Sequence, residues 1–345
     1  MEYVMIKRIL INGAGSAGAR HFEIARDLFP NAQIAILTNR QILDSNLGYK
    51  LHFTNVEEAI QFQPNIAILA GAASTRIEIG LALAKSGVHL LVEKPISVST
   101  KNVENLIEIC AEKKLILAIG YNLRFYESLI YFRDQLNLGV IGKPLLVKCE
   151  VGQFLLSWRE SADYHHSVSA QRKLGGGVLF ELSHEIDYLA WIFGKIEWVR
   201  ATIMQQSSLE IDVEDSAFLT LGIENKKNPN LVANLAMDFI RHDIQRNCIV
   251  IGESGTLKWD GIKQQVSILK QGESSWTNLI TTTHSSNASY LAEWKDFLEC
   301  LETKKSPMAT GIDGLKSLEV IAAALESAPT GKQIEIQPNS FKEDY

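Results

Sequence analysis

A lysine that follows an apolar run is the first residue of this sequence that could do chemistry. Lys94 stands between Glu93 and Pro95, directly after the run 90–92, which predicts a buried strand. Because α/β sheets bind ligands at the carboxyl ends of their strands, an ammonium group here can hydrogen-bond a hydroxyl or carbonyl oxygen. Its charge would stabilise negative charge that develops on that oxygen during a reaction. Lys94 is therefore a candidate catalytic residue; the alternative is a solvated surface lysine.

A glycine-rich turn predicts where a dinucleotide binds. The motif G-x-G-x-x-G follows the apolar run 9–11 and precedes a predicted helix at 21–29. Its glycines allow a tight turn, a close approach of backbone to a pyrophosphate and close helix packing, and the helix N-terminus favours phosphate. The expected contacts from this motif are Gly13, Gly15, Ser16, Ala17 and Gly18. An ordinary glycine turn of an α/β protein is the alternative.

The residues after the second predicted strand indicate which nicotinamide cofactor binds. Asn39 and Arg40 follow the strand 33–37, and no acidic residue stands there to bind a ribose 2′-hydroxyl. An arginine accommodates a 2′-phosphate. We therefore expect NAD(P) as the cofactor, with NADP favoured; a solvated Arg40 would leave NAD possible.

The elements that must position these residues change in kind along the chain. Five strands alternate with helices in the first 120 residues, which predicts a parallel sheet covered on both faces. The predicted strands are 9–12, 33–37, 66–70, 89–92 and 116–119, with helices at 75–85 and 100–112. Later strands joined by polar turns predict a large, mainly antiparallel sheet. These strands are 147–154, 199–204, 216–221, 231–238, 247–251 and 265–269, and helices are expected at 177–193, 290–302 and 312–326.

The expected fold class is therefore α/β, with two domains. A Rossmann domain at 1–122 binds NAD(P), and an α+β domain at 123–345 carries a large, mainly antiparallel open sheet for substrate binding and oligomerisation. The last helices are able to pack back on the first domain.

Composition narrows the classes of partner. The chain has 345 residues, 46% of them hydrophobic and 21% charged, and a formal net charge of −6. Without a Lys/Arg-rich run, we expect no nucleic acid or membrane partner. No apolar run reaches the ~18 residues of a membrane span and no signal-peptide pattern is present, so the expected location is cytoplasmic. Four cysteines without C-x-x-C spacing favour reduced thiols over two disulfides or a zinc site.

Four motifs, in order, resemble the Gfo/Idh/MocA (glucose-fructose oxidoreductase / inositol dehydrogenase) oxidoreductases. They are the glycine motif, 92–95, 120–125, and the glycine run 175–177 that leads to 184–187, so the resemblance covers nearly the whole chain. It implies a Rossmann domain for NAD or NADP and a second domain for a sugar, cyclitol or sugar derivative. It also implies an open sheet for oligomer contacts, so a homodimer or homotetramer is expected.

The resemblance assigns His184 as general acid/base on the substrate oxygen, a task that suits imidazole because its ordinary pKa lies near neutrality. A structural histidine is the alternative. Many family members have an aspartate four residues before this histidine, where this chain has Phe180, and Glu181 stands three residues before. Because residues i and i+3 share a helix face, Glu181 could replace the aspartate, and the question stays open.

The segment 158–166 concentrates donors, acceptors and aromatic rings. It is similar to a W-R…Y…G-G-G stretch of family members in surface-polysaccharide pathways; an ordered surface loop is the alternative. The expected substrate contacts are Lys94, Asn122, Arg124, Trp158, Arg159, Tyr164, His166, Arg172, Glu181 and His184. The further cofactor contacts expected are Gly71, Ala72, Glu93, Lys94 and Asn122, although 71–76 departs from the family's usual threonine-proline and histidine. No metal is expected, because no His or Cys completes a ligand set.

Together these residues predict an oxidoreductase that transfers hydride between nicotinamide and a secondary alcohol or ketone of a sugar, cyclitol or sugar derivative. Lys94 would orient and polarise the oxygen, His184 would exchange its proton, and Asn122 and Arg124 would shape the pocket beside the nicotinamide. Two alternatives stay open: a cofactor-binding sensor or regulator without turnover, and an enzyme that recycles a tightly held cofactor in net non-redox chemistry.

Overall fold

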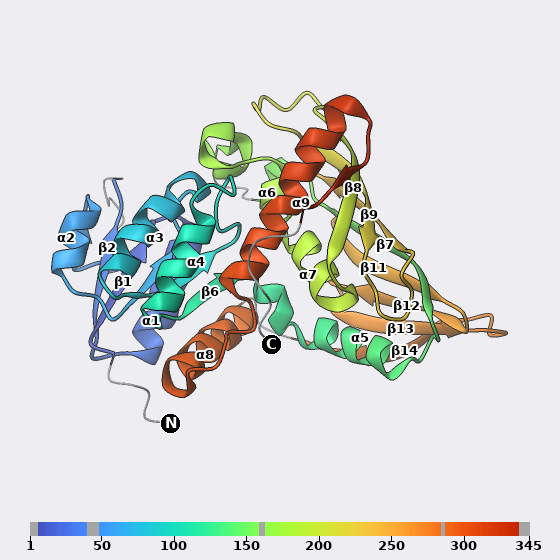
Figure 1. Cartoon of the computed structure of the whole chain (residues 1–345), viewed down its shortest axis with the longest axis horizontal. Coiled ribbons are helices and arrows are strands. Elements are labelled where there is room, and N and C mark those ends of the chain that lie inside the picture. Colours follow the sequence, from blue (N-terminus) through green and yellow to red (C-terminus); the bar gives the residue numbers. More distant parts are fainter. Residues whose placement is uncertain (1–5, 40–47, 159–162, 284–286, 338–345) are drawn as a thin grey trace. The chain divides into compact units, whose positions relative to one another are not determined.

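A computed structural model describes residues 6–39, 48–158, 163–283 and 287–337. The chain divides into two compact units (Figure 1). The first consists of residues 1–125, 173–175 and 284–318, and the second of residues 126–172, 176–283 and 319–345.

The first unit is built on a parallel sheet. Among the described residues it has six strands in the order β3-β2-β1-β4-β5-β6. The strands are β1 (Arg8–Asn12), β2 (Gln33–Leu37), β3 (Leu51–Phe53), β4 (Ile66–Leu69), β5 (His89–Glu93) and β6 (Leu117–Gly120). The chain runs outward from β1 through β2 to β3 and then continues from β4 on the other side of β1. The strand order therefore reverses between β1 and β4, which is where such sheets bind ligands.

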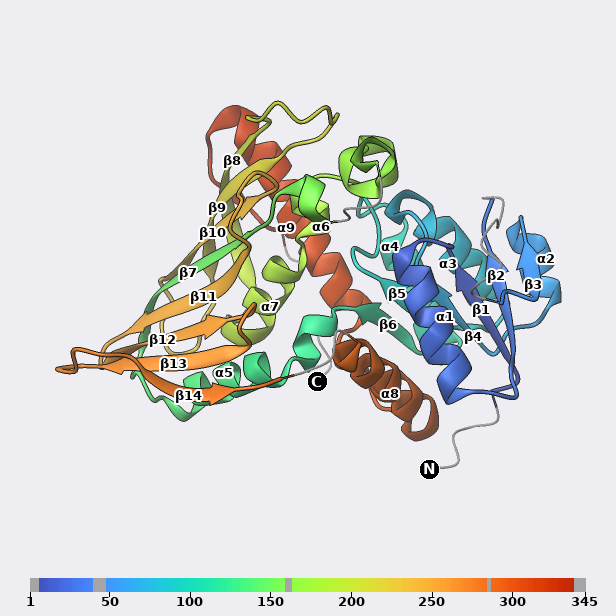
Figure 2. The ribbon, with the colours of Figure 1, turned by 180° about the vertical axis from the view of Figure 1, so that it is seen from behind.

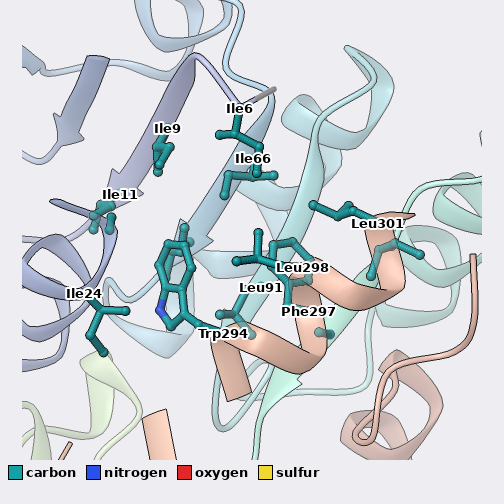
Figure 3. Packing of buried hydrophobic residues seen from close by; sticks show 14 of the residues in the cluster. Ile6, Ile9, Ile11, Ile24, Ile66, Leu91, Trp294, Phe297, Leu298 and Leu301 are labelled. Atoms are coloured by element: carbon teal, nitrogen blue, oxygen red, sulfur yellow. The ribbon is translucent and has the colours of Figure 1, made fainter. Parts of the chain in front are cut away.

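Helices cover both faces of this sheet, as the sequence predicts (Figures 1 and 2). They are α1 (Ser16–Leu28), α2 (Val56–Gln61), α3 (Arg76–Lys85), α4 (Val103–Glu112) and α8 (Ala288–Thr303), with short 3-10 turns at η2 (Ala73–Thr75) and η3 (Asn122–Phe125). Alternate strand residues such as Ile9 and Ile11 form a buried cluster with Ile24 of α1 and with Trp294 and Phe297 of α8 (Figure 3). Strand β3 and helix α2 are too short to give a periodic signal in the sequence.

The second unit contains a larger sheet, mostly antiparallel as predicted. Among the described residues it has nine strands in the order β14-β13-β12-β11-β7-β10-β9-β8-β15, with one parallel pair, β7 and β10. The strands are β7 (Pro144–Gly152), β8 (Ile196–Met204), β9 (Ser216–Ile223), β10 (Leu231–Asp238), β11 (Gln245–Gly252), β12 (Gly255–Asp260), β13 (Gln265–Lys270), β14 (Thr277–Thr281) and β15 (Ile334–Glu335).

Two helices lie against one face of this sheet, α5 (Glu127–Leu138) and α7 (His184–Phe193) (Figure 2). Trp259 of β12 is fully buried and donates its indole N–H to Ser128 Oγ of α5 at 3.0 Å. Arg246 of β11 pairs through Nε with Glu185 Oε1 of α7 at 2.8 Å. The first contact holds α5 on the sheet, and the second holds α7, the helix that begins with His184. Helix α9 (Gly311–Thr330) contributes residues to both units.

The single helix expected at 177–193 is wrong. The segment forms a short helix α6 (Val178–Glu181) and then α7, separated by Leu182 and Ser183. Leu182 has φ −101° and ψ 24°, which takes the backbone out of the α-helical region and ends α6. Hydrophobic periodicity alone continues through such a break, because the side chains on both sides are buried.

The second unit also contains short 3-10 turns, which carry much of the aromatic segment. They are η4 (Leu155–Trp158), η5 (Tyr164–His166), η6 (Val168–Ala170) and η7 (Arg172–Leu174, which extends into the first unit). Among the helices that the structure describes, none is both long and apolar enough to cross a membrane.

Candidate cofactor and catalytic site

The turn between β1 and α1 packs as closely as its glycines predict. Gly13 has φ +98°, and a Cβ there would lie 2.7 Å from Gly71 N. A Cβ on Gly18 would lie 1.9 Å from Gly13 O, so this glycine allows α1 to pack directly on the turn. A Cβ on Gly15 would have no heavy atom within 4 Å, and Gly15 caps α1 without a side-chain hydrogen bond. Ser16 and Ala17 follow Gly15 at the start of α1, where backbone N–H groups have no acceptor within the helix, and their contact with a pyrophosphate stays a prediction.

Hydrogen bonds join the ends of the neighbouring strands at this turn. Leu37 O, at the end of β2, accepts Gly13 N–H at 2.9 Å and Asn12 Nδ2–H at 3.2 Å. Ala70 N–H, after β4, donates to Asn12 O at 2.9 Å. Gly71 then passes so close to the Asn12 amide that a Cβ would lie 2.6 Å from its Oδ1. Gly71 and Ala72 thus lie beside the glycine turn, in agreement with a cofactor site at this edge.

Two expected determinants of cofactor choice follow β2. Asn39 is exposed. Arg40 lies outside the described residues, so a contact between Arg40 and a 2′-phosphate stays a prediction.

Lys94 is partly buried and directly follows β5, which neighbours β4 in the sheet. Its backbone N–H donates to Glu93 Oε2 at 3.2 Å, and the peptide bond from Lys94 to Pro95 is cis. The other carboxylate oxygen of Glu93 is 3.0 Å from His21 Nε2 of α1. The residue before Lys94 is therefore anchored to the helix that follows the glycine turn.

The partners of His21 indicate which tautomer its neutral ring adopts. Trp294 Nε1–H of α8 donates to His21 Nδ1 at 2.9 Å. Because an indole nitrogen only donates, Nδ1 must accept, and the neutral ring then carries its proton on Nε2 and donates it to Glu93. Burial opposes the charge of Glu93, but the hydrogen bond from His21 and the positive charges of Arg76 and Lys94 outweigh burial and lower the pKa of Glu93. Glu93 is thus an ionised acceptor.

A second buried carboxyl group lies on the same unit. Glu293 of α8 is 3% exposed, and neither of its oxygens has a hydrogen-bond partner among the described residues. Burial, together with the negative charges of Glu93 and Asp296, raises the pKa of Glu293 well above its ordinary value. The pKa values of Glu93 and Glu293 therefore shift in opposite directions, because His21, Arg76 and Lys94 stabilise the charge of Glu93.

Asn122 and Arg124, which the sequence predicts beside the nicotinamide, lie in η3 of the same unit and are buried. Asn122 Nδ2 donates to Ser289 Oγ at 2.9 Å. Arg124 donates to Met308 O at 2.6 Å and pairs with Asp313 at 3.2 Å, and although burial opposes it, this arginine lowers the pKa of Asp313. Both side chains thus have partners within the unit, and their contacts with cofactor or substrate stay predictions.

The second unit carries the predicted acid/base residue. His184 is 9% exposed and is the first residue of α7, while Glu181 is the last residue of α6 and accepts from Ser169 Oγ at 3.1 Å. The two residues therefore do not share the face of one continuous helix. Whether Glu181 replaces the family's aspartate stays a prediction.

The structure locates only part of the predicted substrate segment. Trp158 packs edge-on against Phe239 at 5.1 Å between ring centroids, and Tyr164 Oη accepts the Glu210 N–H at 3.3 Å. Arg172 is exposed, and its Nε donates to Asp212 O at 3.1 Å. Arg159 and the side chain of His166 lie outside the described residues.

Sequence analysis misses several residues around these positions. Glu214 accepts Leu179 N–H at 3.2 Å, and its Oε1 would lie 2.2 Å from a Cβ on Gly177, which has φ +100°. Burial raises the pKa of Glu214. His21 was also missed, although a polar residue at an inward helix position, three residues after Gly18, is a signal the sequence contains. Nothing in the sequence pairs Glu214 with the glycine run.

No three His, Cys, Asp or Glu side chains in the described part of the chain come together as they would around a metal ion. The expectation of a site without metal stays a prediction.

The sequence matches two family models along most of its length. Residues 7–121 match the model described as oxidoreductase family, NAD-binding Rossmann fold, and residues 133–336 match that described as oxidoreductase family, C-terminal alpha/beta domain. Among individual relatives, a myo-inositol 2-dehydrogenase of Thermotoga maritima is 24% identical over 351 residues, covering 96% of this chain and 98% of that protein. A scyllo-inositol 2-dehydrogenase (NAD(+)) of Bacillus subtilis is 25% identical over 276 residues, covering 78% and 77%.

Solved structures share the fold at lower identity. Levoglucosan dehydrogenase in complex with NADH and levoglucosan has a TM-score of 0.83 and 15% identity, covering 96% of this chain and 100% of that chain. The WlbA dehydrogenase from Bordetella pertussis in complex with NADH and UDP-GlcNAcA has a TM-score of 0.79 and 17% identity, covering 97% and 100%. These likenesses confirm the predicted arrangement of a Rossmann domain followed by a mostly antiparallel α+β domain.

Proposed function

The chain belongs to the Gfo/Idh/MocA oxidoreductase family, and we propose that it transfers hydride between a nicotinamide cofactor and a CH–OH carbon of a sugar, cyclitol or sugar derivative. The names of its relatives support this class of substrate, since they include inositol and levoglucosan dehydrogenases. A place in surface-polysaccharide metabolism remains part of the proposal, and the solved complex of a relative with UDP-GlcNAcA agrees with it.

One observation carries the proposal. The open space at Gly15, the close approach of Gly71 and the position of Lys94 occur at the ends of three neighbouring strands, β1, β4 and β5. A binding site for a cofactor phosphate and a cation for the substrate oxygen therefore lie at the same edge of one sheet, near the point where its strand order reverses.

Different residues of the chain bind the cofactor, orient the substrate and transfer the proton. The cofactor, when bound, supplies or accepts the hydride. The N–H groups after Gly15 bind its pyrophosphate, and Lys94 orients the substrate and stabilises negative charge on the reacting oxygen. His184 takes the proton of the hydroxyl group during oxidation and returns it during reduction. Asn122 and Arg124 shape the pocket next to the nicotinamide.

Isotope transfer tests the function directly. NADH and NADPH, deuterated at C4 on both faces, are incubated with the ketone forms of a panel of sugars and cyclitols, including the oxidation product of myo-inositol, and the product is examined for deuterium on carbon. We expect transfer with the wild type and none with Lys94→Ala, which should still bind NADH. Absence of transfer to every member of the panel would exclude a dehydrogenase of this substrate class. Deuterium transfer without net release of cofactor would instead favour recycled, net non-redox chemistry.

The choice of cofactor is tested by melting the protein with NAD, NADH, NADP and NADPH in parallel. We propose a preference for NADP through Arg40. Equal stabilisation by NADH and NADPH would remove that preference. A cytoplasmic location is also part of the proposal. The free thiols of the four cysteines agree with a reducing compartment.

We also propose that two copies of the chain associate through the outer face of the second sheet, as a homodimer or within a homotetramer. Phe218 in the middle of β9 is 50% exposed, and Arg200 and Lys148 lie in the neighbouring row of the sheet. Glu150 lies in the row of Phe218 and pairs with Arg241 of the same chain. A two-fold contact would place Phe218 of one copy against the same patch of the other and bury its exposed ring.

A further inference from the structure

Arg76 makes an unusual set of contacts for a buried arginine. It is the first residue of α3 and is 7% exposed. Its Nε–H donates to Gly71 O at 3.0 Å, and Nη1–H donates to Glu93 O at 2.7 Å and also to Pro95 O. Three carbonyl oxygens of the backbone therefore accept from one guanidinium group.

The positions of these carbonyls connect Arg76 to the proposed chemistry. Glu93 and Pro95 are the residues on either side of Lys94, so the guanidinium group holds the backbone before and after the lysine. Gly71 lies beside the glycine turn, as its close approach to Asn12 shows. Because the guanidinium group is planar and rigid, its hydrogen bonds fix the three carbonyls in one geometry.

We propose that Arg76 is a positioning residue for Lys94. It holds the turn that carries Lys94 at a fixed distance from the β4 loop, so that the ammonium group meets the substrate oxygen while the cofactor is bound. This inference rests on the function proposed above. A lysine side chain is long and flexible, and its reach depends on where its backbone is held; a displacement of about 1 Å can lower a catalysed rate by ~10²-fold.

The guanidinium group of Arg76 has enough N–H donors for these three contacts. The segment 71–76 departs from the common threonine-proline and histidine, and Arg76 stands at its end. An imidazole ring has two nitrogen atoms and at most two N–H donors, whereas a guanidinium group has five. Arg76 thus supplies enough donors for all three carbonyls, and this chain has an arginine-based support for the turn.

Arg76→Lys is the informative variant, because it keeps the positive charge and removes the rigid fork. We expect kcat to fall at least tenfold with a substrate from the panel above, while KM for that substrate changes less than about threefold. The primary deuterium isotope effect on kcat should rise, because hydride transfer becomes slower relative to other steps. Added guanidinium ion should restore part of the kcat of Arg76→Ala.

Arg8→Lys is the matched control. Arg8 also donates to a backbone carbonyl, Gln63 O, at 2.8 Å, but it lies at the opposite end of β1 from the glycine turn. We expect its kcat and isotope effect to equal those of the wild type. An equal loss in Arg8→Lys and Arg76→Lys would overturn the proposal, as would an unchanged kcat in Arg76→Lys.

Hydrogen exchange gives a measurement that does not depend on turnover. The peptide 91–98 should exchange faster in Arg76→Lys than in the wild type or in Arg8→Lys, while NADH still binds. Unchanged exchange in this peptide would overturn the proposal. The outcomes are separable: a wild type that transfers no hydride refutes the proposed function, whereas an active wild type, an inactive Lys94→Ala and a normal Arg76→Lys refute only the role of Arg76.

Discussion

A methyl group at Gly15 should block the cofactor without harming the fold. Gly15 has φ −82° and ψ −173°, which any residue adopts, and a Cβ there would have no neighbour within 4 Å. Replacing glycine by alanine at such a position stabilises a protein by about 0.4–1 kcal/mol through the unfolded chain. Alanine is a poorer N-cap than glycine by a similar amount. These effects oppose each other, so Gly15→Ala should change the free energy of unfolding by less than about 1 kcal/mol.

The effect on binding should be much larger, because the methyl group occupies the space that the pyrophosphate needs. NADH at one hundred times its Kd stabilises the wild type by about 2.7 kcal/mol. A tenfold weaker Kd in Gly15→Ala reduces this to about 1.4 kcal/mol at the same concentration, and a complete block removes it. The assay is thermal melting with and without NADH, together with a fluorescence titration of NADH.

Gly18→Ala is the matched control for this prediction. Its Cβ would lie 1.9 Å from Gly13 O, a backbone atom that has no freedom to rotate away. We expect this variant to lose about 1–3 kcal/mol of stability even without cofactor, through overpacking. The reasoning would be refuted if Gly15→Ala bound NADH like the wild type, or if it were destabilised as much as Gly18→Ala.

Three further predictions concern stability and assembly. The folded-state pKa of Glu293 lies above its unfolded value, so the burial of this group costs stability as pH rises above about 4.5. Glu293→Gln should therefore melt at a higher temperature than the wild type at pH 7 and at the same temperature at pH 4. An equal or lower melting temperature of the variant at pH 7 would contradict this. Arg246→Met should cost about 3–5 kcal/mol in denaturant unfolding, because it leaves the fully buried Glu185 without its cation; adding Glu185→Leu should recover part of the loss, and a neutral single variant would count against the pair. Phe218→Glu should yield monomers in light scattering while its circular dichroism spectrum stays that of the wild type, and an unchanged oligomer would exclude this face.

The segments with strong local signals could be predicted from the sequence. The G-x-G-x-x-G motif and the residues around Lys94 lie directly after buried strands, and the strands 33–37 and 231–238 were predicted with the bounds that the structure has. Such features depend on a few adjacent residues whose backbone preferences and periodicity suffice to specify a turn or a buried strand. Cofactor class and family follow from the same local motifs.

The helix break before His184 and the parallel pairing of β7 with β10 could not be predicted in this way. Both depend on which distant segment packs against a given side chain, and hydrophobic periodicity reports only that a side chain is buried. The ion pair of Arg124 with Asp313, 189 positions further along the chain, could not be predicted for the same reason, and the contact of Arg124 with a substrate stays a prediction.

The sequence by itself determined the class of fold, the glycine turn proposed to hold a dinucleotide, and the position of Lys94 directly after β5. Each of these is encoded by residues that are neighbours in the sequence. Only the tertiary structure decided what supports that lysine. Hydrogen bonds connect Trp294 to His21 and His21 to Glu93. Arg76 in turn contacts the backbone carbonyls on both sides of Lys94. Trp294 and His21 are 273 residues apart. A hydrogen bond across that separation forms only when α1 and α8 pack on one face of the sheet, and no local pattern specifies it.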